Sequence, residues 1–214
     1  MPLTSPMYRC TGVQQGGGGT SCDAVIEGTA TIVTNATKVK KNVFSYDSIL
    51  ESFTGTSVTE IGESAFRNTT NLQTLSLGAL TSIGTTAFYS AGKSGSTFDI
   101  VLNSAVVASQ GFQASRVRYV TGTWSSAAGS CLRACTSLKK LEFNLQQLPN
   151  YFLYGDTALE EIYLSYSQAV VTCDGNNCLT NVPSTCKVYV PSALVSSYQA
   201  DSNWSRFDIQ ALPS

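Results

Sequence analysis

The chain has 214 residues, 43% of them hydrophobic, which is enough for one domain or one run of stacked repeats. Only 13% of the residues are charged, well below the usual quarter, and the formal net charge is −1. This balance argues against nucleic acids and anionic membranes as partners. The sequence contains no histidine, which removes the commonest general base and metal ligand from its possible chemistry.

The first 22 residues are predicted to form a flexible, glycine-rich leader. The run Gly16–Gly19 loses much backbone entropy on ordering. A phosphate-binding loop is the alternative, but no Lys-Ser or Lys-Thr pair follows the glycines. The opening residues 1–10 lack the charged and apolar regions of a signal peptide. No apolar run approaches the roughly 18–20 residues of a membrane-spanning helix.

An apolar motif with a period of 22 residues dominates the next part of the chain. It consists of an aliphatic residue, a second one three positions later, and an Ala-Phe pair. Its positions are Val58, Ile61, Ala65 and Phe66 in one copy and Leu80, Ile83, Ala87 and Phe88 in the next. A fixed period of this length predicts a solenoid, in which each turn buries its apolar face against its neighbours.

Less regular copies extend the repeat in both directions. The Ala-Phe position is filled by Val43-Phe44, Gly111-Phe112, Cys131-Leu132, Phe152-Leu153 and Cys178-Leu179. We therefore predict about seven turns over residues 23–190, with capping strands in 23–35 and short strands at 98–102 and 117–120. Two insertions, 91–96 and 121–130, are predicted as loops. Gly62 and Gly84 are expected to supply a positive φ in a tight turn.

The repeat ends at Pro191, and residues 191–214 are predicted to cap the last open turn. A short amphipathic helix follows the proline, with Ser192 as its N-cap. Trp204 and Phe207 lie between this helix and a closing strand at 209–212. An atypical final unit of this kind is how repeat arrays cover their exposed core.

The pattern VTxIGxxAFxxxxxLxxLxL resembles the BspA-like leucine-rich repeats of bacterial surface proteins, which also occur among phage-encoded proteins. The resemblance covers about residues 36–212 and is most specific over 58–88 and 178–207. It implies a right-handed leucine-rich-repeat solenoid with a parallel β-sheet on one face and irregular or short helical connections on the other. It also implies a binding or adhesive role without enzymatic activity or cofactors.

The seven cysteines allow three interpretations. Cys131 and Cys178 occupy the small-residue position of the repeat, which favours packing as small apolar side chains. A disulfide is the first alternative, with Cys173–Cys178 or Cys10–Cys22 as the pair. A zinc site is the second, but the chain offers neither a histidine nor a Cys-x-x-Cys motif.

Side chains that alternate with the buried strand residues are expected to form ladders on the outer face of the parallel sheet. In the early turns these are hydroxyl residues: Ser52, Thr54, Thr74 and Ser76. In the later turns they form a candidate binding patch with mixed charge and two tyrosines: Lys140, Glu142, Glu161, Tyr163, Lys187 and Tyr189. Tyrosine is a frequent anchor of protein interfaces. The loops at 91–96 and 121–130 are rival sites.

Two hypotheses for function follow. The first is an extracellular module, on a bacterial surface or a virion, that binds a protein or a glycan without nucleic-acid binding or membrane insertion. The second is a structural or decorating component of a phage particle or surface assembly. An enzyme is disfavoured, because the chain lacks histidine and a Gly-x-Ser-x-Gly motif, and the adjacent Glu160 and Glu161 are predicted to point to opposite faces of a strand.

Overall fold

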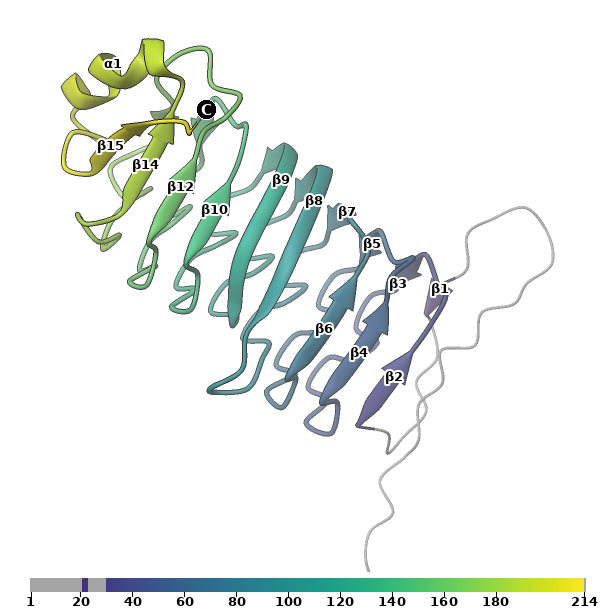
Figure 1. Cartoon of the computed structure of the whole chain (residues 1–214). Coiled ribbons are helices and arrows are strands. Elements are labelled where there is room, and N and C mark those ends of the chain that lie inside the picture. Colours follow the sequence, from purple (N-terminus) through teal and green to yellow (C-terminus); the bar gives the residue numbers. More distant parts are fainter. Residues whose placement is uncertain (1–20, 23–29, 214) are drawn as a thin grey trace, which may run out of the picture.

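A computed structural model describes residues 21–22 and 30–213 as a stack of short β-strands closed by a helical segment (Figure 1). Residues 1–20 of the leader predicted over 1–22, with Gly16–Gly19 and Cys10, lie outside the described residues, as does the segment 23–29, whereas the last two residues of that predicted leader form a short strand. The elements in chain order are β1 Ser21–Cys22, β2 Thr31–Val33, β3 Lys38–Val39, β4 Ser52–Gly55, β5 Glu60–Ile61, β6 Thr74–Leu77, β7 Leu80–Ile83, β8 Phe98–Val107, β9 Val117–Ala127, β10 Lys140–Glu142, β11 Gln147–Leu148, β12 Glu161–Tyr163, β13 Thr172–Cys173, β14 Lys187–Val190, the 3-10 helix η1 Ser192–Leu194, α1 Val195–Ala200 and β15 Asp208–Ala211.

All pairings between the described strands are parallel, and they form about nine turns. The sequence repeat suggested about seven, because it did not count the terminal strands as turns. The main sheet has ten strands in the order β1-β3-β5-β7-β8-β9-β10-β12-β14-β15. Two smaller sheets, β2-β4-β6 and β11-β13, run beside it. The predicted solenoid with a parallel sheet is confirmed.

The core contains the predicted column of aromatic rings. The ring centroids of Phe44 and Phe66 are 5.2 Å apart, those of Phe66 and Phe88 are 5.3 Å apart, and those of Phe88 and Phe112 are also 5.3 Å apart. All four side chains are buried. The rings of Phe66 and Phe88 are stacked and almost parallel, with an angle of 1° between their planes. One aromatic ring per turn thus fills the same place in successive turns, which is what the period of 22 residues predicts.

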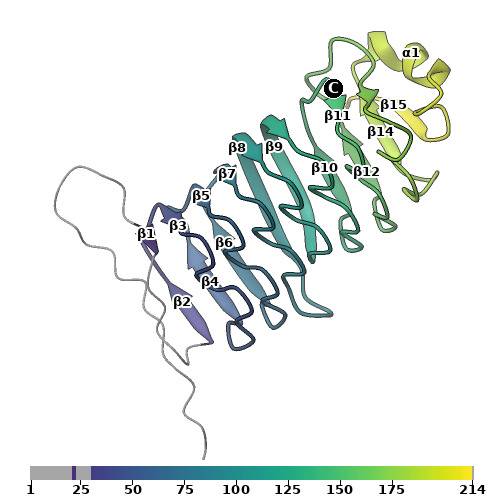
Figure 2. The same ribbon diagram turned by 180° about the vertical axis from the view of Figure 1, so that it is seen from behind.

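The connections on the side opposite the strands, called here the loop side, are irregular turns and contain no helix within 30–190 (Figure 2). The turns around Phe44, Phe66, Phe88 and Phe112 each use two left-handed residues, two positions before and two after the buried aromatic, as with Ser64 and Asn68 around Phe66. The N–H of Phe66 donates to the carbonyl of Ala87 in the next turn at 2.8 Å. Equivalent bonds recur along the stack, so the loop side satisfies its backbone groups without helices.

The expectation for Gly62 and Gly84 was wrong, because neither has a positive φ. Both glycines lie where the backbones of adjacent turns approach closely. A Cβ added at Gly84 would meet the backbone nitrogen of Glu63 at 2.5 Å, and one added at Gly62 would meet the backbone nitrogen of Lys41 at 2.6 Å. Glycine is therefore required at both positions because the gap between adjacent turns is too narrow for a Cβ atom.

Gly84→Ala is expected to lower the free energy of unfolding by more than about 1 kcal/mol, because backbone atoms of the neighbouring turn cannot move aside as a flexible side chain could. Urea denaturation measures the change. Gly129→Ala is the matched control, since an added Cβ there would meet only the carbonyl oxygen of Asn150, at 3.3 Å. An equal loss in the two variants would contradict this explanation.

The middle of the chain is more regular than the sequence suggested. The predicted strand 98–102 extends to Val107 in β8, and the predicted strand 117–120 extends to Ala127 in β9. Most of the proposed insertion 121–130 is therefore strand. Each long strand continues past register shifts, as between Leu102 and Ala105 of β8, so it spans a width that other turns cover with two short strands.

The C-terminal cap covers the last turn with aromatic side chains. Tyr198 and Trp204 are fully buried, and the Trp204 indole N–H donates to the carbonyl of Val171 at 2.7 Å. The hydroxyl of Tyr198 accepts the N–H of Val171 at 3.0 Å. The closing strand β15 adds to the main sheet beside β14, close to the predicted 209–212. Ser192 is no N-cap: it lies inside η1, and neither helical segment has a side-chain cap.

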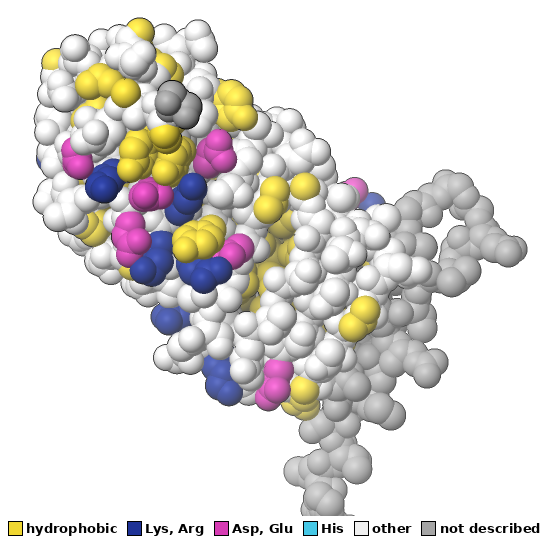
Figure 3. Space-filling view, in the orientation of Figure 1, with side chains coloured by type: hydrophobic (Ala, Val, Ile, Leu, Met, Phe, Trp, Pro, Cys, Tyr) yellow, Lys and Arg dark blue, Asp and Glu magenta, His cyan; other side chains and the backbone are white. Residues whose placement is uncertain are grey.

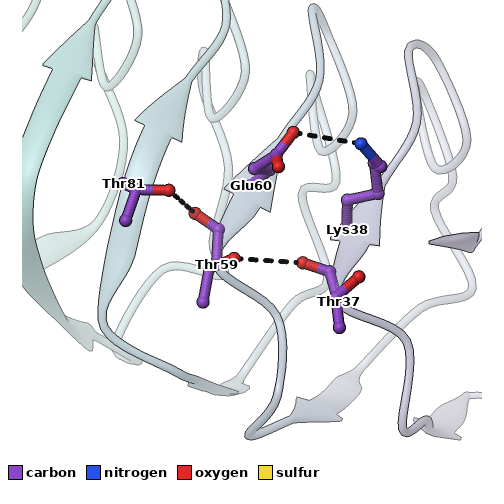
Figure 4. Close-up of polar contacts among 5 residues, drawn as sticks. All are labelled: Thr37, Lys38, Thr59, Glu60 and Thr81. Atoms are coloured by element: carbon purple, nitrogen blue, oxygen red, sulfur yellow. Dashed lines mark hydrogen bonds and ion pairs between the residues drawn. The ribbon is translucent and has the colours of Figure 1, made fainter. Parts of the chain in front are cut away.

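Polar side chains also repeat from turn to turn (Figure 4). The hydroxyl of Thr59 donates to the carbonyl of Thr37 at 3.4 Å, and that of Thr81 donates to the carbonyl of Thr59 at 3.2 Å. Beside this ladder Lys38 and Glu60 form an ion pair at 3.3 Å. The ion pair is solvent-exposed and adds little to stability, but together with the threonine hydrogen bonds, one of them partly buried, it helps to fix the register of neighbouring turns.

Candidate functional site

The six residues of the candidate patch lie side by side on the outer face of the main sheet. They come from β10, β12 and β14, which are adjacent and in register. One row contains Lys140, Glu161 and Lys187, and the second contains Glu142, Tyr163 and Tyr189. We call these six residues the sheet patch. Figure 3 shows charged side chains gathered on this end of the face, whereas most of the remaining described face carries few charges.

Aromatic contacts hold the centre of the sheet patch in place. The rings of Tyr163 and Tyr189 stack with centroids 4.6 Å apart and an angle of 21° between their planes. The Lys140 ammonium lies 4.1 Å from the centroid of the Tyr163 ring, a cation–π contact. The Tyr163 hydroxyl donates to Glu161 at 3.2 Å. Burial, reinforced by Glu161, raises the pKa of Tyr163, so this hydroxyl remains a hydrogen-bond donor at neutral pH.

The charged side chains of the sheet patch are only partly neutralised within the molecule. Glu142 accepts neutral donors: the N–H of Gly122 at 3.3 Å and the hydroxyl of Ser165 at 3.4 Å. Neither Lys140 nor Lys187 forms an ion pair with any residue in the part of the chain that the structure describes. The two ammonium groups are therefore available to a ligand.

An open groove borders the sheet patch where β10, β12 and β14 begin. Its volume is about 500 Å³, and its lining includes Glu160, Glu161, Pro183 and Lys187. On its far side Lys139 and Glu160 form an ion pair at 2.7 Å. The hydrogen bond from Lys139 to Glu160 raises the pKa of that lysine. Glu161 and Lys187 belong both to the groove and to the sheet patch, so one ligand could contact the groove and the tyrosine pair.

The structure extends the first row of the patch by residues that the sequence did not identify. Tyr119 of β9 is in register with Lys140, and Asp99 of β8 is in register with Tyr119. Arg118 forms a salt bridge with Asp99 at 2.7 Å and lies 4.4 Å from the centroid of the Tyr119 ring. This register could not be predicted from the sequence, because the strand residues within 98–127 do not follow the period of 22.

The hydroxyl residues of the early turns pair as expected, Ser52 with Thr74 and Thr54 with Ser76, but their expected place on the same sheet as the later residues was wrong. Ser52 and Thr54 lie on β4, and Thr74 and Ser76 lie on β6, and both strands belong to the small sheet β2-β4-β6. They are a separate polar surface beside the early turns. Of the two rival loops, residues 91–96 are indeed irregular, whereas residues 121–127 form part of β9.

The described cysteines fit the packing interpretation. Cys131, Cys135, Cys178 and Cys186 are buried, and Cys173 is half-buried, and all five are free thiols. The alternative of a Cys173–Cys178 disulfide is not formed, because both cysteines are free. Burial raises the pKa of Cys173 to about 12 and that of Cys186 to about 12, which keeps both thiols protonated. The alternative pair with Cys10 lies outside the described residues.

The described part of the chain has neither the side-chain cluster of a metal site nor a helix suited to a bilayer. No cluster of three or more histidine, cysteine, aspartate or glutamate residues with metal-binding geometry occurs there. Within the same residues, no helix is both long enough and apolar enough to cross a bilayer.

Comparison with known proteins agrees with this architecture. The chain is similar to the crystal structure of the pneumococcal vaccine antigen PcpA, with a TM-score of 0.53 and 21% sequence identity over 87% of this chain. The match covers 42% of PcpA, so this chain spans less than half of that protein's length, and the likeness shows the fold alone. No curated protein matches the chain.

The model of the BspA type leucine rich repeat region matches in six copies, over residues 37–121 and 81–201. These matches include the aromatic column, β8 and β9, the strands of the sheet patch and α1. They cover most of the sequence. The chain therefore belongs to the family of BspA-type leucine-rich repeat proteins.

Proposed function

We propose that the chain is a non-enzymatic binding module that recognises a protein or a glycan through the sheet patch. The single observation that carries the proposal is the stacked pair of Tyr163 and Tyr189, next to the lysines Lys140 and Lys187, which form no ion pair with any described residue. Tyrosines that are already stacked lose little side-chain entropy on binding, which is why such anchors dominate many interfaces.

Binding explains the surface chemistry better than catalysis. The tyrosines lie on strands of a rigid sheet, and their hydroxyl groups and the neighbouring carboxylates offer donors and acceptors to a ligand. The sequence supplies no histidine, and burial holds the pKa of the described thiols above the usual range, so nucleophilic or general base chemistry lacks its usual groups.

An extracellular position completes the proposal. The sequence resembles repeats of bacterial surface proteins, the chain belongs to the BspA-type repeat family, and the protein with the similar fold is named as a vaccine antigen. These observations support an extracellular location, where molecules of a host can contact the sheet patch. The proposal extends to a bacterial cell surface or a virion.

The double variant Tyr163→Ala/Tyr189→Ala tests this function. Wild-type protein is first screened against immobilised extracellular host proteins and glycans. We expect every ligand of the sheet patch to bind the variant at least about 30-fold more weakly, the loss typical of an interface hot spot of 2 kcal/mol or more. Surface plasmon resonance gives the affinities, and circular dichroism verifies that the variant is folded.

The matched control is Tyr151→Ala/Tyr154→Ala, which removes two tyrosines in ring contact, with centroids 5.4 Å apart, from the loop side. We expect this control to retain binding to ligands of the sheet patch. If the ligands found in the screen bind wild type and Tyr163→Ala/Tyr189→Ala equally, the sheet patch is not the binding site.

A further inference from the structure

A second set of aromatic and basic side chains follows the loop side, away from the sheet patch. It consists of residues one or two positions from the buried aromatic of each turn, called here the loop-side stripe: Tyr46, Arg67, Tyr89, Gln113, Arg133, Tyr151 and Tyr154. Backbone hydrogen bonds place most of them in one column. The carbonyls of Arg67, Tyr89, Gln113, Arg133 and Tyr154 each accept an N–H from the preceding turn.

Each arginine of the stripe lies between two tyrosine rings. The Arg67 guanidinium carbon is 5.6 Å from the ring centroid of Tyr46 and 5.4 Å from that of Tyr89. The Arg133 guanidinium carbon is 5.3 Å and 5.1 Å from the rings of Tyr151 and Tyr154. An arginine in contact with two tyrosine rings therefore occurs twice, three turns apart, on one side of the solenoid. The rings around Arg67 come from the turns on either side of it, whereas Tyr151 and Tyr154 come from one turn and also contact each other. These cation–π contacts hold each guanidinium in place before any ligand arrives.

These guanidinium groups have no anionic partner in the part of the chain that the structure describes. The ion pairs there use Lys38, Lys41, Arg118 and Lys139. The Nε of Arg67 is buried without a hydrogen-bond partner, so the terminal N–H groups are the donors that this half-buried side chain can offer to a ligand. Arginine presents its N–H donors in a planar fork that fits carboxylate, sulfate and phosphate oxygens. The stripe thus has fixed donors for anions and nothing of its own to fill them.

We propose that the loop-side stripe binds an acidic polysaccharide, with acidic groups on the arginines and sugar rings against the exposed tyrosine surface. Tyr46, at 64% exposure, offers the largest such surface. The two arginines are three turns apart, which is about 14 Å at roughly 4.8 Å per turn. A polymer with several anionic units along this length can place acidic groups at both arginines while its sugar rings contact the tyrosines.

Two other anionic partners fit the stripe less well. An acidic peptide would need free backbone groups or side-chain pockets for recognition, but the loop-side amides of Phe44, Tyr46 and Asn68 are already bonded to the next turn. A nucleic acid would need a broad positive field to neutralise closely spaced phosphates, and the chain has a net charge of −1. Isolated arginines between tyrosines match a more sparsely charged chain.

The test uses the full chain and dextran sulfate as the probe, with neutral dextran, poly-glutamate and a single-stranded DNA oligonucleotide as comparison ligands. Wild type is expected to bind dextran sulfate, more weakly as salt rises, and to bind the comparison ligands at least about tenfold more weakly. Arg67→Gln/Arg133→Gln is expected to lose about tenfold or more in affinity, because each arginine supplies charge-assisted hydrogen bonds. Arg67→Lys/Arg133→Lys keeps the charge but loses the planar fork, and is expected to restore only part of the affinity.

The matched control is Arg118→Gln/Lys139→Gln, which removes the same charge from the sheet side. It should change the affinity for dextran sulfate less than about twofold, and Tyr163→Ala/Tyr189→Ala should not change it, which separates this proposal from the function of the sheet patch. Should a glutamine variant lose its folded circular dichroism spectrum, Arg133→Gln alone is measured instead. Equal losses in stripe and control variants, or equal binding of poly-glutamate or DNA, would overturn the proposal.

Discussion

Replacing Phe66 by alanine is expected to lower the free energy of unfolding by about 3–5 kcal/mol, the range for deletion of a large buried aromatic side chain. Phe66 is fully buried and contacts the rings of Phe44, Phe53 and Phe88 at centroid distances of 5.1 to 5.3 Å. The cavity left behind would interrupt the aromatic column between two turns. Urea denaturation followed by circular dichroism measures the loss.

The repeat architecture adds a second expectation for this variant. Each turn of a solenoid is stabilised mainly by its nearest neighbours, so a defect at Phe66 should weaken the N-terminal turns more than the C-terminal ones. Val33→Ala serves as the control, because Val33 is 74% exposed and its replacement should change stability by less than about 0.5 kcal/mol. A loss at Phe66 as small as that of the control would mean that the rings do not pack as described.

The second large effect concerns Asp156, a carboxyl group buried at 0% exposure. Its Oδ1 accepts the N–H of Cys135 at 2.7 Å, while Oδ2 has no hydrogen-bond partner. Burial raises the pKa of Asp156 well above its usual range, because the charged form is poorly solvated inside the core. The folded protein therefore binds a proton at Asp156 that the unfolded chain releases at lower pH.

The sign of the pH dependence follows from this difference. A raised pKa in the folded state gives a contribution that is complete below the unfolded pKa and is lost as pH rises toward the folded pKa. Over that interval the free energy of unfolding falls by up to about 1.4 kcal/mol per pH unit. Wild-type protein should therefore lose stability through this group as the pH rises above the usual pKa of an aspartate, about 4.

Asp156→Asn should remove this dependence, because the amide oxygen can still accept the Cys135 N–H and the side chain cannot ionise. The variant should match wild type near pH 4 and exceed its stability at pH 7. Denaturation curves across this pH range measure the difference, with Asp208→Asn at an exposed position as the control. A difference between Asp156→Asn and wild type that does not grow with pH would refute the assignment.

The sequence was sufficient to predict the stacked turns, because the core imposes a rule on spacing. A ring must recur at the same place in each turn, so Phe44, Phe66 and Phe88 had to be separated by whole periods. The alternation of buried and outward residues in short strands gave the sheet patch in the same way. Its two rows follow directly from the strand register.

Other features depend on contacts between turns, which periodicity does not reveal. The role of Gly84 comes from the backbone of the preceding turn, and a positive φ is supplied instead by Thr86 and Ser90. The length of β8 depends on irregularities that let one strand replace two. The loop-side stripe is visible in the sequence as a spacing of 21 and 22 residues between Tyr46, Arg67 and Tyr89, but a repeat pattern built on apolar residues does not include these positions.

Amide hydrogen exchange tests the stacking of turns most directly, because it reports on bonds that no isolated loop would have. The N–H groups of Phe44, Phe66, Phe88 and Phe112 each donate to a carbonyl of the next turn, at 2.7 to 2.8 Å. We expect these four loop-side amides to exchange as slowly as the amides of the paired strands. Rapid exchange at these amides, with protection confined to the strands, would contradict a solenoid whose turns are bonded on both sides.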